Sequence, residues 1–235
     1  MKLLTEPIVD WEHPADASQG RDYIALLAAL RHHLPAPQYT LSSALPAGEW
    51  ALQHINLGHA AQYLDMVNLM AYDYSGPWVP KTGHQAQLFT PQVPHCPEGA
   101  ISCHSAVSYM MRQGVPPHKI VMGVPAYGRS FTDTRGVGHS FKGHAGEEGT
   151  FEYRDLPRPG AKEHVDEQLG AAYCMGGDGG FVTYDTPHTV RMKANYVRQN
   201  GLGGLFYWTG TGDASSIHQK DRSLVYNGFL GLFPQ

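Results

Sequence analysis

Two acids lie close together near the start of the chain, in the stretch IVDWEHP at residues 8–14. One residue separates Asp10 from Glu12, and a β-strand directs residues i and i+2 to the same face. The apolar run predicts a strand at 6–11, so both carboxyls should point into the space that this strand lines. Carboxyl groups that share a site are typical of acid–base work on glycosidic bonds.

Aromatic residues, a further acid and an arginine follow other predicted strands. Aromatic faces stack on pyranose rings, so this mixture suits the binding and cleavage of sugars. Burial beside aromatic rings, together with a neighbouring carboxylate, disfavours the ionised form of Glu12 and would keep the proton that a general acid needs. The candidate residues are Tyr72, Asp73, Trp78, Tyr127, Arg129 and Trp208.

Short apolar runs alternate with helical patterns along the chain, which indicates an α/β fold with a parallel sheet covered by helices. The candidates gather at the carboxyl ends of the strands, where a (β/α)8 barrel carries its active site. No glycine-rich phosphate motif follows a strand, so a dinucleotide-binding fold is not supported. We expect strands at 6–11, 39–45, 65–72, 119–126 and 203–208, and helices at 16–34, within 49–63, and at 101–113, 187–199 and 222–232.

The region 131–185 has a different character, with many glycines and the short β-like pieces FEYRDL and FVTYD around MGGDGG. It predicts a small inserted α+β domain with a sheet of its own. Residues 1–130 and 186–235 would then form the main domain, which includes a long loop at 74–100.

The charge balance excludes several classes of partner. The net charge is −4 and the pI is near 6.4, so neither nucleic acid nor an anionic membrane surface is expected to bind. No stretch reaches the roughly 18 apolar residues of a membrane span, and no apolar signal segment follows Lys2. As written, the chain is expected in the cytoplasm, and secretion would require a natural N-terminus further upstream.

Sulfur and imidazole groups predict neither a disulfide framework nor a metal site. Three cysteines, Cys96, Cys103 and Cys174, cannot all pair within one chain, which favours a reducing compartment. The 14 histidines show no HExxH or paired CxxC spacing, so we expect them in solvated surface or loop positions.

Five blocks of the sequence carry a resemblance to one enzyme family. VDWEHP at 9–14 resembles the end of the DGxDxDWEYP signature of family 18 glycoside hydrolases, the chitinases. Four more blocks resemble family segments in the same order: YTLSSALPAG, YLDMVNLMAYDYSGPW, KIVMGVPAYGRSF and GLGGLFYWTGTGD. An α+β insertion before the last strand is similar to one in bacterial and fungal chitinases. The resemblance implies a catalytic TIM (β/α)8 barrel and covers nearly the whole chain from residue 8.

The resemblance gives the two acids separate roles. Glu12 is similar to the general acid that protonates the leaving glycosidic oxygen. Asp10 is similar to the acid that orients the N-acetyl group of the substrate and tunes Glu12. The acetamido oxygen of the substrate, and no enzyme carboxylate, attacks the sugar and gives an oxazolinium ion. Tyr72 would hydrogen-bond that acetamido oxygen.

The other matched residues are implied to bind sugar. Asp73 and Arg129 would hold sugar hydroxyls beside the reacting centre. Trp208 would form the floor under the reacting sugar, and Trp78 would stack on a sugar on the leaving-group side. No metal or organic cofactor is implied, and the implied ligands are chitin and chito-oligosaccharides. The same pocket would be lined by Met70 and Tyr127.

The chain departs from the family pattern at its start. Thr5 and Glu6 stand at the first Asp-Gly of the signature, and Ile8 stands at its middle Asp. That middle acid normally shares protons with the other two, so Ile8 changes their coupled titration. The first block looks like the fourth barrel strand, so about three of the eight βα units would be absent and the chain would be N-terminally truncated. The open edges of a partial barrel of about five βα units predict marginal stability or self-association.

The combined interpretation is a chitinase-like glycosidase that cleaves β-1,4 links between N-acetylglucosamine units with retention of configuration, with internal cleavage favoured. A chitin-binding lectin on the same fold is the first alternative, although such relatives usually lack the acid that Glu12 supplies. An inactive remnant is the second alternative, and Ile8 and the missing strands favour it.

Overall fold

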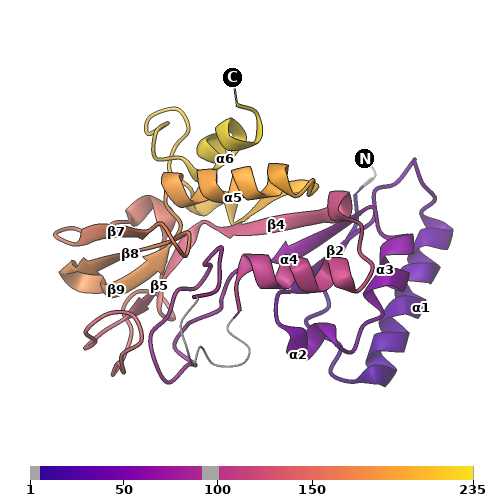
Figure 1. Cartoon of the computed structure of the whole chain (residues 1–235), viewed down its shortest axis with the longest axis horizontal. Coiled ribbons are helices and arrows are strands. Elements are labelled where there is room, and N and C mark those ends of the chain that lie inside the picture. The colour runs from indigo at the N-terminus through magenta and orange to yellow at the C-terminus, as the bar shows by residue number, and fades with distance from the viewer. Residues whose placement is uncertain (1–5, 92–100, 235) are drawn as a thin grey trace.

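In the computed structural model, which describes residues 6–91 and 101–234, the chain forms two five-stranded sheets with helices packed around them (Figure 1). The first sheet is parallel and has the order β1-β2-β3-β4-β10. Each of its strands falls at a predicted strand, which confirms the α/β class. The strands are β1 Ile8–Val9, β2 Ser42–Pro46, β3 Met66–Met70, β4 Ile120–Pro125 and β10 Gly204–Trp208.

The helices begin where the sequence offers side-chain caps. Asp16 accepts hydrogen bonds from the backbone N–H groups of Ser18 and Gln19 before α1. Thr186 caps α5, and Pro187 occupies the first turn, where its missing N–H costs nothing. The helices are α1 Ala17–His33, α2 Glu49–Leu52, α3 Leu57–Tyr63, α4 Cys103–Arg112, α5 Pro187–Gln199 and α6 Leu224–Leu232.

The second sheet is antiparallel and has the order β6-β5-β9-β8-β7. It begins at Tyr127, ahead of residue 131, because only Ala126 separates β4 from β5. The segment MGGDGG forms the turn between β8 and β9, where Gly176, Gly177 and Gly180 adopt positive φ angles. The strands are β5 Tyr127–Phe131, β6 Thr150–Glu152, β7 Lys162–Asp166, β8 Ala171–Gly176 and β9 Gly180–Tyr184.

Two groups of buried apolar side chains hold these layers together. The first lies between the parallel sheet and the helices α1, α3 and α4, and includes Leu27, Leu45, Leu69, Val107 and Met122. The second joins β4 and the second sheet to α5 and α6; in Figure 1, α5 runs along β4 and α6 lies on the far side of α5. Its members include Val124, Tyr153, Val182, Tyr184, Val190 and Leu224.

The loop after β3 packs against the second sheet. Gln85 donates a hydrogen bond from Nε2 to the carbonyl oxygen of Tyr127 at 2.8 Å. His84 is only 6% exposed, and burial lowers its pKa to about 4. The expectation that the histidines are solvated is therefore wrong for His84, because the loop folds inward across the sheet.

The described cysteines are buried, and the described helices do not span a membrane. Cys103 and Cys174 are buried free thiols, and Cys96 lies outside the described residues. In the described part of the chain, none of the helices combines the length and the apolar character needed to cross a bilayer.

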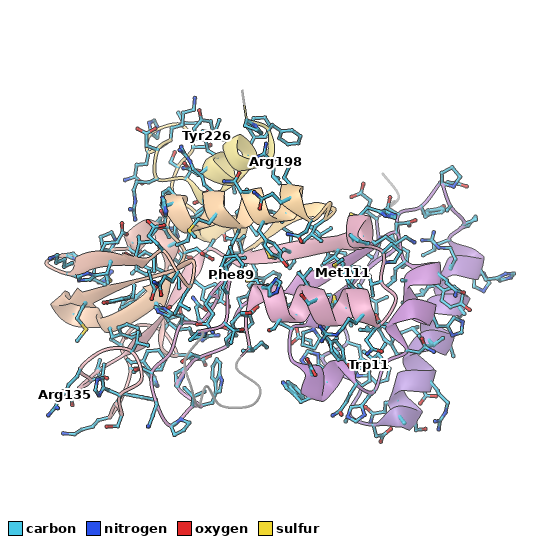
Figure 2. The ribbon with its side chains drawn as sticks, in the orientation of Figure 1. Trp11, Phe89, Met111, Arg135, Arg198 and Tyr226 are labelled. Atoms are coloured by element: carbon cyan, nitrogen blue, oxygen red, sulfur yellow. The ribbon has the colours of Figure 1, made fainter. Side chains whose placement is uncertain are left out.

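A buried chain of hydrogen bonds fixes the short strand β1 to the rest of the sheet. The hydroxyl of Tyr23 donates to Oγ of Ser43 at 2.7 Å, and that hydroxyl donates to the carbonyl oxygen of Val9 at 2.7 Å. Trp11 packs against the ring of Tyr23 with centroids 6.4 Å apart, and so lies towards α1 (Figure 2). These contacts set the place where the chain leaves β1 and reaches Asp10.

Replacing Ser43 by alanine should destabilise the protein by about 1–3 kcal/mol, because the buried hydroxyl of Tyr23 would lose its acceptor. Ser42→Ala is the matched control on the same strand, since its hydroxyl makes only a 3.4 Å contact with Asn68, and we expect it to cost less than about 1 kcal/mol. Chemical denaturation measures both values. The double variant Ser43→Ala/Tyr23→Phe should recover part of the loss, and equal losses in the two serine variants would contradict the prediction.

Candidate active site

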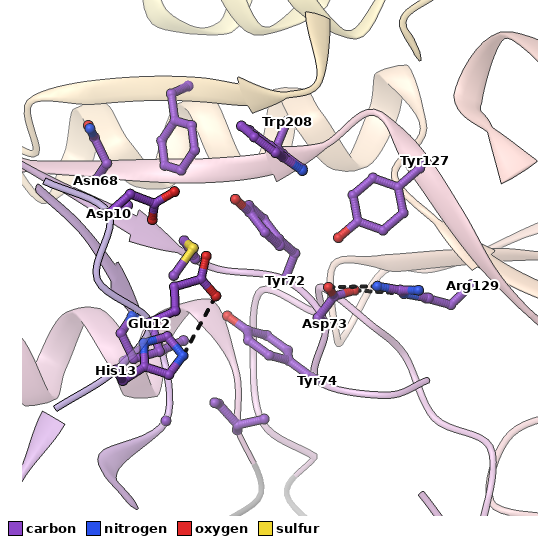
Figure 3. A pocket seen from close by; sticks show the side chains of 18 of the residues that line it. Asp10, Glu12, His13, Asn68, Tyr72, Asp73, Tyr74, Tyr127, Arg129 and Trp208 are labelled. Carbon is purple, nitrogen blue, oxygen red and sulfur yellow. Dashed lines mark hydrogen bonds and ion pairs between the residues drawn. The ribbon is translucent and has the colours of Figure 1, made fainter. Parts of the chain in front are cut away.

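A cleft of about 1490 Å³ opens at the carboxyl edge of the parallel sheet (Figure 3). Parallel strands end at the same edge, so the residues just beyond β1, β2, β3, β4 and β10 meet there. The cleft brings together all nine residues singled out from the sequence, although their roles remain predictions. They are Asp10, Glu12, Met70, Tyr72, Asp73, Trp78, Tyr127, Arg129 and Trp208.

Asp10 and Glu12 lie just past the end of β1, which contains two residues only. Both side chains point into the cleft (Figure 3). Half of the Glu12 side chain, 52%, is exposed, so the expected burial beside aromatic rings is wrong. The physical reason is that Glu12 projects into open space instead of packing against a wall. Ile8, at the position of the expected middle acid, also lines the cleft and is 61% exposed.

Tyr72 stands in the centre of the cleft, between two other rings. Its ring meets Tyr127 and Phe206 edge-on, with both pairs of centroids 6.2 Å apart. Gly123 makes room for this arrangement, since a Cβ there would lie 2.7 Å from Tyr72 Cε1. Burial raises the pKa of Tyr72, and the carboxylates of Asp73, Glu12 and Asp10 raise it further. The phenol therefore keeps its proton and is available as a hydrogen-bond donor.

Asp73 and Arg129 form a two-pronged ion pair across the cleft. Nε and one terminal nitrogen of Arg129 each donate to a different carboxylate oxygen of Asp73 at 2.8 Å. The guanidinium also lies 4.9 Å from the centroid of Trp78 and 5.2 Å from that of Tyr127. Asp73 has a φ of +60°, a conformation that directs its side chain towards the second sheet. The pair therefore links the two sheets at the cleft wall.

Exposed aromatic faces distinguish this cleft from an ordinary surface. Trp208, at the end of β10, is 55% exposed, and Trp78 is 59% exposed. Large apolar side chains that remain in solvent around a concave site are typical of ligand-binding surfaces. Met70 supplies an apolar contact from the end of β3 on the same wall.

Sequence reasoning missed several residues of the cleft. Asn68 lies beside Asp10 (Figure 3), and it interrupts the apolar run of β3 at the same alternate positions as Met70. A polar residue within an apolar strand could have identified Asn68 as a residue of the cleft. Nε2 of His13 lies 3.8 Å from the Glu12 carboxylate, while its Nδ1 is buried and has no hydrogen-bond partner among the described residues. Trp50 also lines the cleft, and no spacing rule marked it.

The described ranges hold no group of three or more His, Cys, Asp or Glu side chains arranged to bind a metal ion. The side chains that line the cleft offer carboxyls, phenols, a guanidinium and aromatic faces. These groups are suited to proton transfer and to the binding of a polyhydroxylated ring.

Comparisons with known proteins agree on one family. The family model described as glycosyl hydrolases family 18 matches residues 9–213. Chitinase 1 of Aphanocladium album is 35% identical over 97% of this chain and 55% of its own length. Endochitinase 1 of Metarhizium robertsii is 35% identical over 92% of this chain and 53% of its own length. The chain thus spans about half the length of these curated relatives.

A solved structure gives the same result for the fold. A mutant of catalytic domain 2 of the Group II chitinase from Ostrinia furnacalis, in complex with (NAG)5, superposes with a TM-score of 0.87. The two sequences are 25% identical, and the match covers 97% of this chain and 66% of the other. The cleft, the family model and these relatives lead to one conclusion: the chain belongs to family 18 of the glycosyl hydrolases.

Proposed function

We propose that this chain is a chitinase that cleaves β-1,4 links between N-acetylglucosamine units with retention of configuration. The observation that carries the proposal is that Glu12, Asp10 and the exposed Trp208 share one open cleft. Family membership adds the substrate class, since relatives named chitinase and endochitinase match most of this chain. Those names also favour cleavage within the polymer.

In the proposed reaction, Glu12 gives its proton to the glycosidic oxygen while the acetamido oxygen of the substrate attacks the anomeric carbon. A new C–O bond forms as the glycosidic C–O bond breaks, which yields an oxazolinium ion and a free hydroxyl on the leaving sugar. Glu12, now ionised, removes a proton from the water that opens the ring, and the original configuration returns. The exposure of Glu12 supports this role, because the carboxyl must reach both the leaving oxygen and the water.

Asp10 and Tyr72 would hold the acetamide that attacks. The Asp10 carboxylate accepts a hydrogen bond from the acetamide N–H, and the Tyr72 hydroxyl donates one to the acetamide oxygen. The raised pKa of Tyr72 supports its role, since burial and the nearby carboxylates keep the phenol neutral. The proposed role of Asp10 is supported by the hydrogen bond from the Ser43 hydroxyl to the carbonyl oxygen of Val9, because it fixes the backbone next to Asp10.

The remaining residues would hold the sugars on each side. The Asp73–Arg129 pair offers carboxylate and guanidinium groups to ring hydroxyls. Trp208 would stack under the reacting sugar, and Trp78 under a sugar on the leaving-group side. Met70 and Tyr127 complete the wall.

The parallel sheet is proposed to be part of a TIM (β/α)8 barrel, with the antiparallel sheet as the inserted α+β domain. The strand order of the two sheets supports this division, since the second sheet lies between β4 and β10 along the chain. The domains would be 1–130 with 186–235, and 131–185, with β5 as the crossing strand between them.

A chitin-binding lectin or an inactive remnant is the alternative function. The observation that favours the inactive remnant is Ile8, which lines the cleft and is 61% exposed. A carboxyl at that position would exchange protons with Asp10, and an isoleucine cannot.

Glu12→Gln should reduce the hydrolysis of a chromogenic chitobioside by about 100-fold or more, because the amide has no proton to transfer. The change keeps the size and the exposed position of the side chain, so folding should be unaffected. Glu167→Gln is the control, since that acid is exposed and pairs with His188 outside the cleft. The assay compares initial rates of the three proteins.

A chitin pull-down separates the alternatives. Binding to chitin without turnover by the unchanged chain would support the lectin. Neither binding nor turnover would support the remnant. Equal turnover by the Glu12→Gln variant would remove Glu12 from the mechanism.

We also propose that the chain self-associates through the open edges of the parallel sheet. In the described residues, β1 and β10 pair on one side only, and α6 beside β10 exposes Val225, Phe229 and Phe233. Light scattering should therefore report dimers or larger species, and Phe229→Glu should shift them to smaller ones. A monomer that melts in one cooperative calorimetric transition would contradict this prediction.

A further inference from the structure

Two Gly-x-Trp segments follow neighbouring strands and bring a tryptophan each to the cleft. GEW at 48–50 follows β2, and GPW at 76–78 follows β3. β2 and β3 are neighbours, and their last residues, Pro46 and Met70, face each other in the register. Both tryptophans are largely exposed, 67% for Trp50 and 59% for Trp78.

Each indole lies across the glycine that precedes it by two residues. A Cβ on Gly48 would lie 2.2 Å from Nε1 of Trp50, and a Cβ on Gly76 would lie 2.3 Å from Cη2 of Trp78. Both distances are shorter than any Cβ atom can approach another heavy atom, so the rings can take these positions only because residues 48 and 76 are glycines. The backbone supports one part of each ring and leaves the remainder in solvent.

Trp50 lines the cleft next to His13, the residue that follows Glu12. Its ring meets His13 edge-on, with the centroids 5.6 Å apart and the planes at 80°. His13 lies on the side of Glu12 that faces away from Trp208 (Figure 3). A second hollow of about 350 Å³ adjoins the cleft here, with Trp50, His13 and His54 among its walls.

Packing does not explain why a tryptophan stands at position 50, because most of its indole is exposed. Trp50 lies outside both buried apolar groups of the described residues, and two-thirds of its surface is in water. Aromatic faces bind the C–H faces of pyranose rings, and rigid tryptophans lose little conformational entropy when they do so. His54 and Glu49 stand beside the ring with polar groups suited to sugar hydroxyls.

We propose that Trp50 is a sugar-stacking platform on the leaving-group side, which lengthens the binding surface and favours long chito-oligosaccharides. The inference rests on the proposed function, because Glu12 as proton donor separates the reacting sugar over Trp208 from the leaving sugars. Sugars that leave past Glu12 then meet His13 and Trp50. Trp50 is therefore a residue that determines the preferred length of the substrate.

Isothermal titration calorimetry tests the platform without any need for turnover. The reference protein carries Glu12→Gln, and its affinities for the di- and hexasaccharides of N-acetylglucosamine are compared with those of the Glu12→Gln/Trp50→Ala protein. We expect the hexasaccharide to bind about tenfold more weakly after the loss of the indole, a typical cost for truncating an aromatic contact residue. The ratio of hexasaccharide to disaccharide affinity should fall by a similar factor.

Gly48→Ala in the same background tests the position of the ring. Gly48 has a φ of −77° and a ψ of 127°, which alanine adopts freely, so the new methyl group should displace the indole and leave the backbone intact. Its hexasaccharide affinity should fall as it does for Trp50→Ala. Ile217→Ala is the control, since that side chain is 83% exposed outside the cleft.

The outcomes separate the inference from the proposed function. Hexasaccharide binding that is equal in the reference and Trp50→Ala proteins would overturn the platform and leave the proposed function standing. A reference protein that binds neither oligosaccharide would overturn both. A loss of the same size in Ile217→Ala would also overturn the platform, because the effect would then be unrelated to the cleft.

Discussion

Parallel pairing in register is the constraint on which the whole site depends. β2, β3, β4 and β10 run in one direction, with Pro46 opposite Met70 and Pro125 opposite Trp208. Because parallel strands all end at one edge of the sheet, the residues that follow each strand meet there and form one cleft. A shift of one residue in any pairing would turn that strand's side chains to the opposite face, so the register also selects which residues enter the cleft.

The cleft keeps its polar groups in different states by giving them different surroundings. Tyr72 is pressed between Tyr127 and Phe206 and stays a neutral donor. Asp73 is held by Arg129, which supplies both charge and hydrogen bonds. Glu12 is half exposed, so its carboxyl is open to a ligand in the cleft. An exposed carboxyl, a neutral phenol and a fixed ion pair therefore line one cleft.

Most of the parallel sheet and the nine cleft residues could be predicted from the sequence, because apolar strands and helix caps are local signals. Asp16 and Thr186 mark the starts of α1 and α5 by chemistry that needs no partner elsewhere. The open position of Glu12 and the burial of His84 could not be predicted, since each depends on how distant segments fold over one another. The place of Trp50 in the cleft could not be predicted for the same reason, because only the structure shows that its ring lies outside the core.

Because its walls come from distant parts of the sequence, the cleft cannot form until β10 has been synthesised. Asp10 and Glu12 leave the ribosome before Trp208, which lines the same cleft and follows almost 200 residues later. β10 pairs directly with β4, with Val121 opposite Gly204, although all five strands of the antiparallel sheet lie between them in the sequence. Both carboxyls therefore stay open to water until β10 has been made and has paired with β4. A stop before β10 would release a chain that has these acids and lacks Trp208.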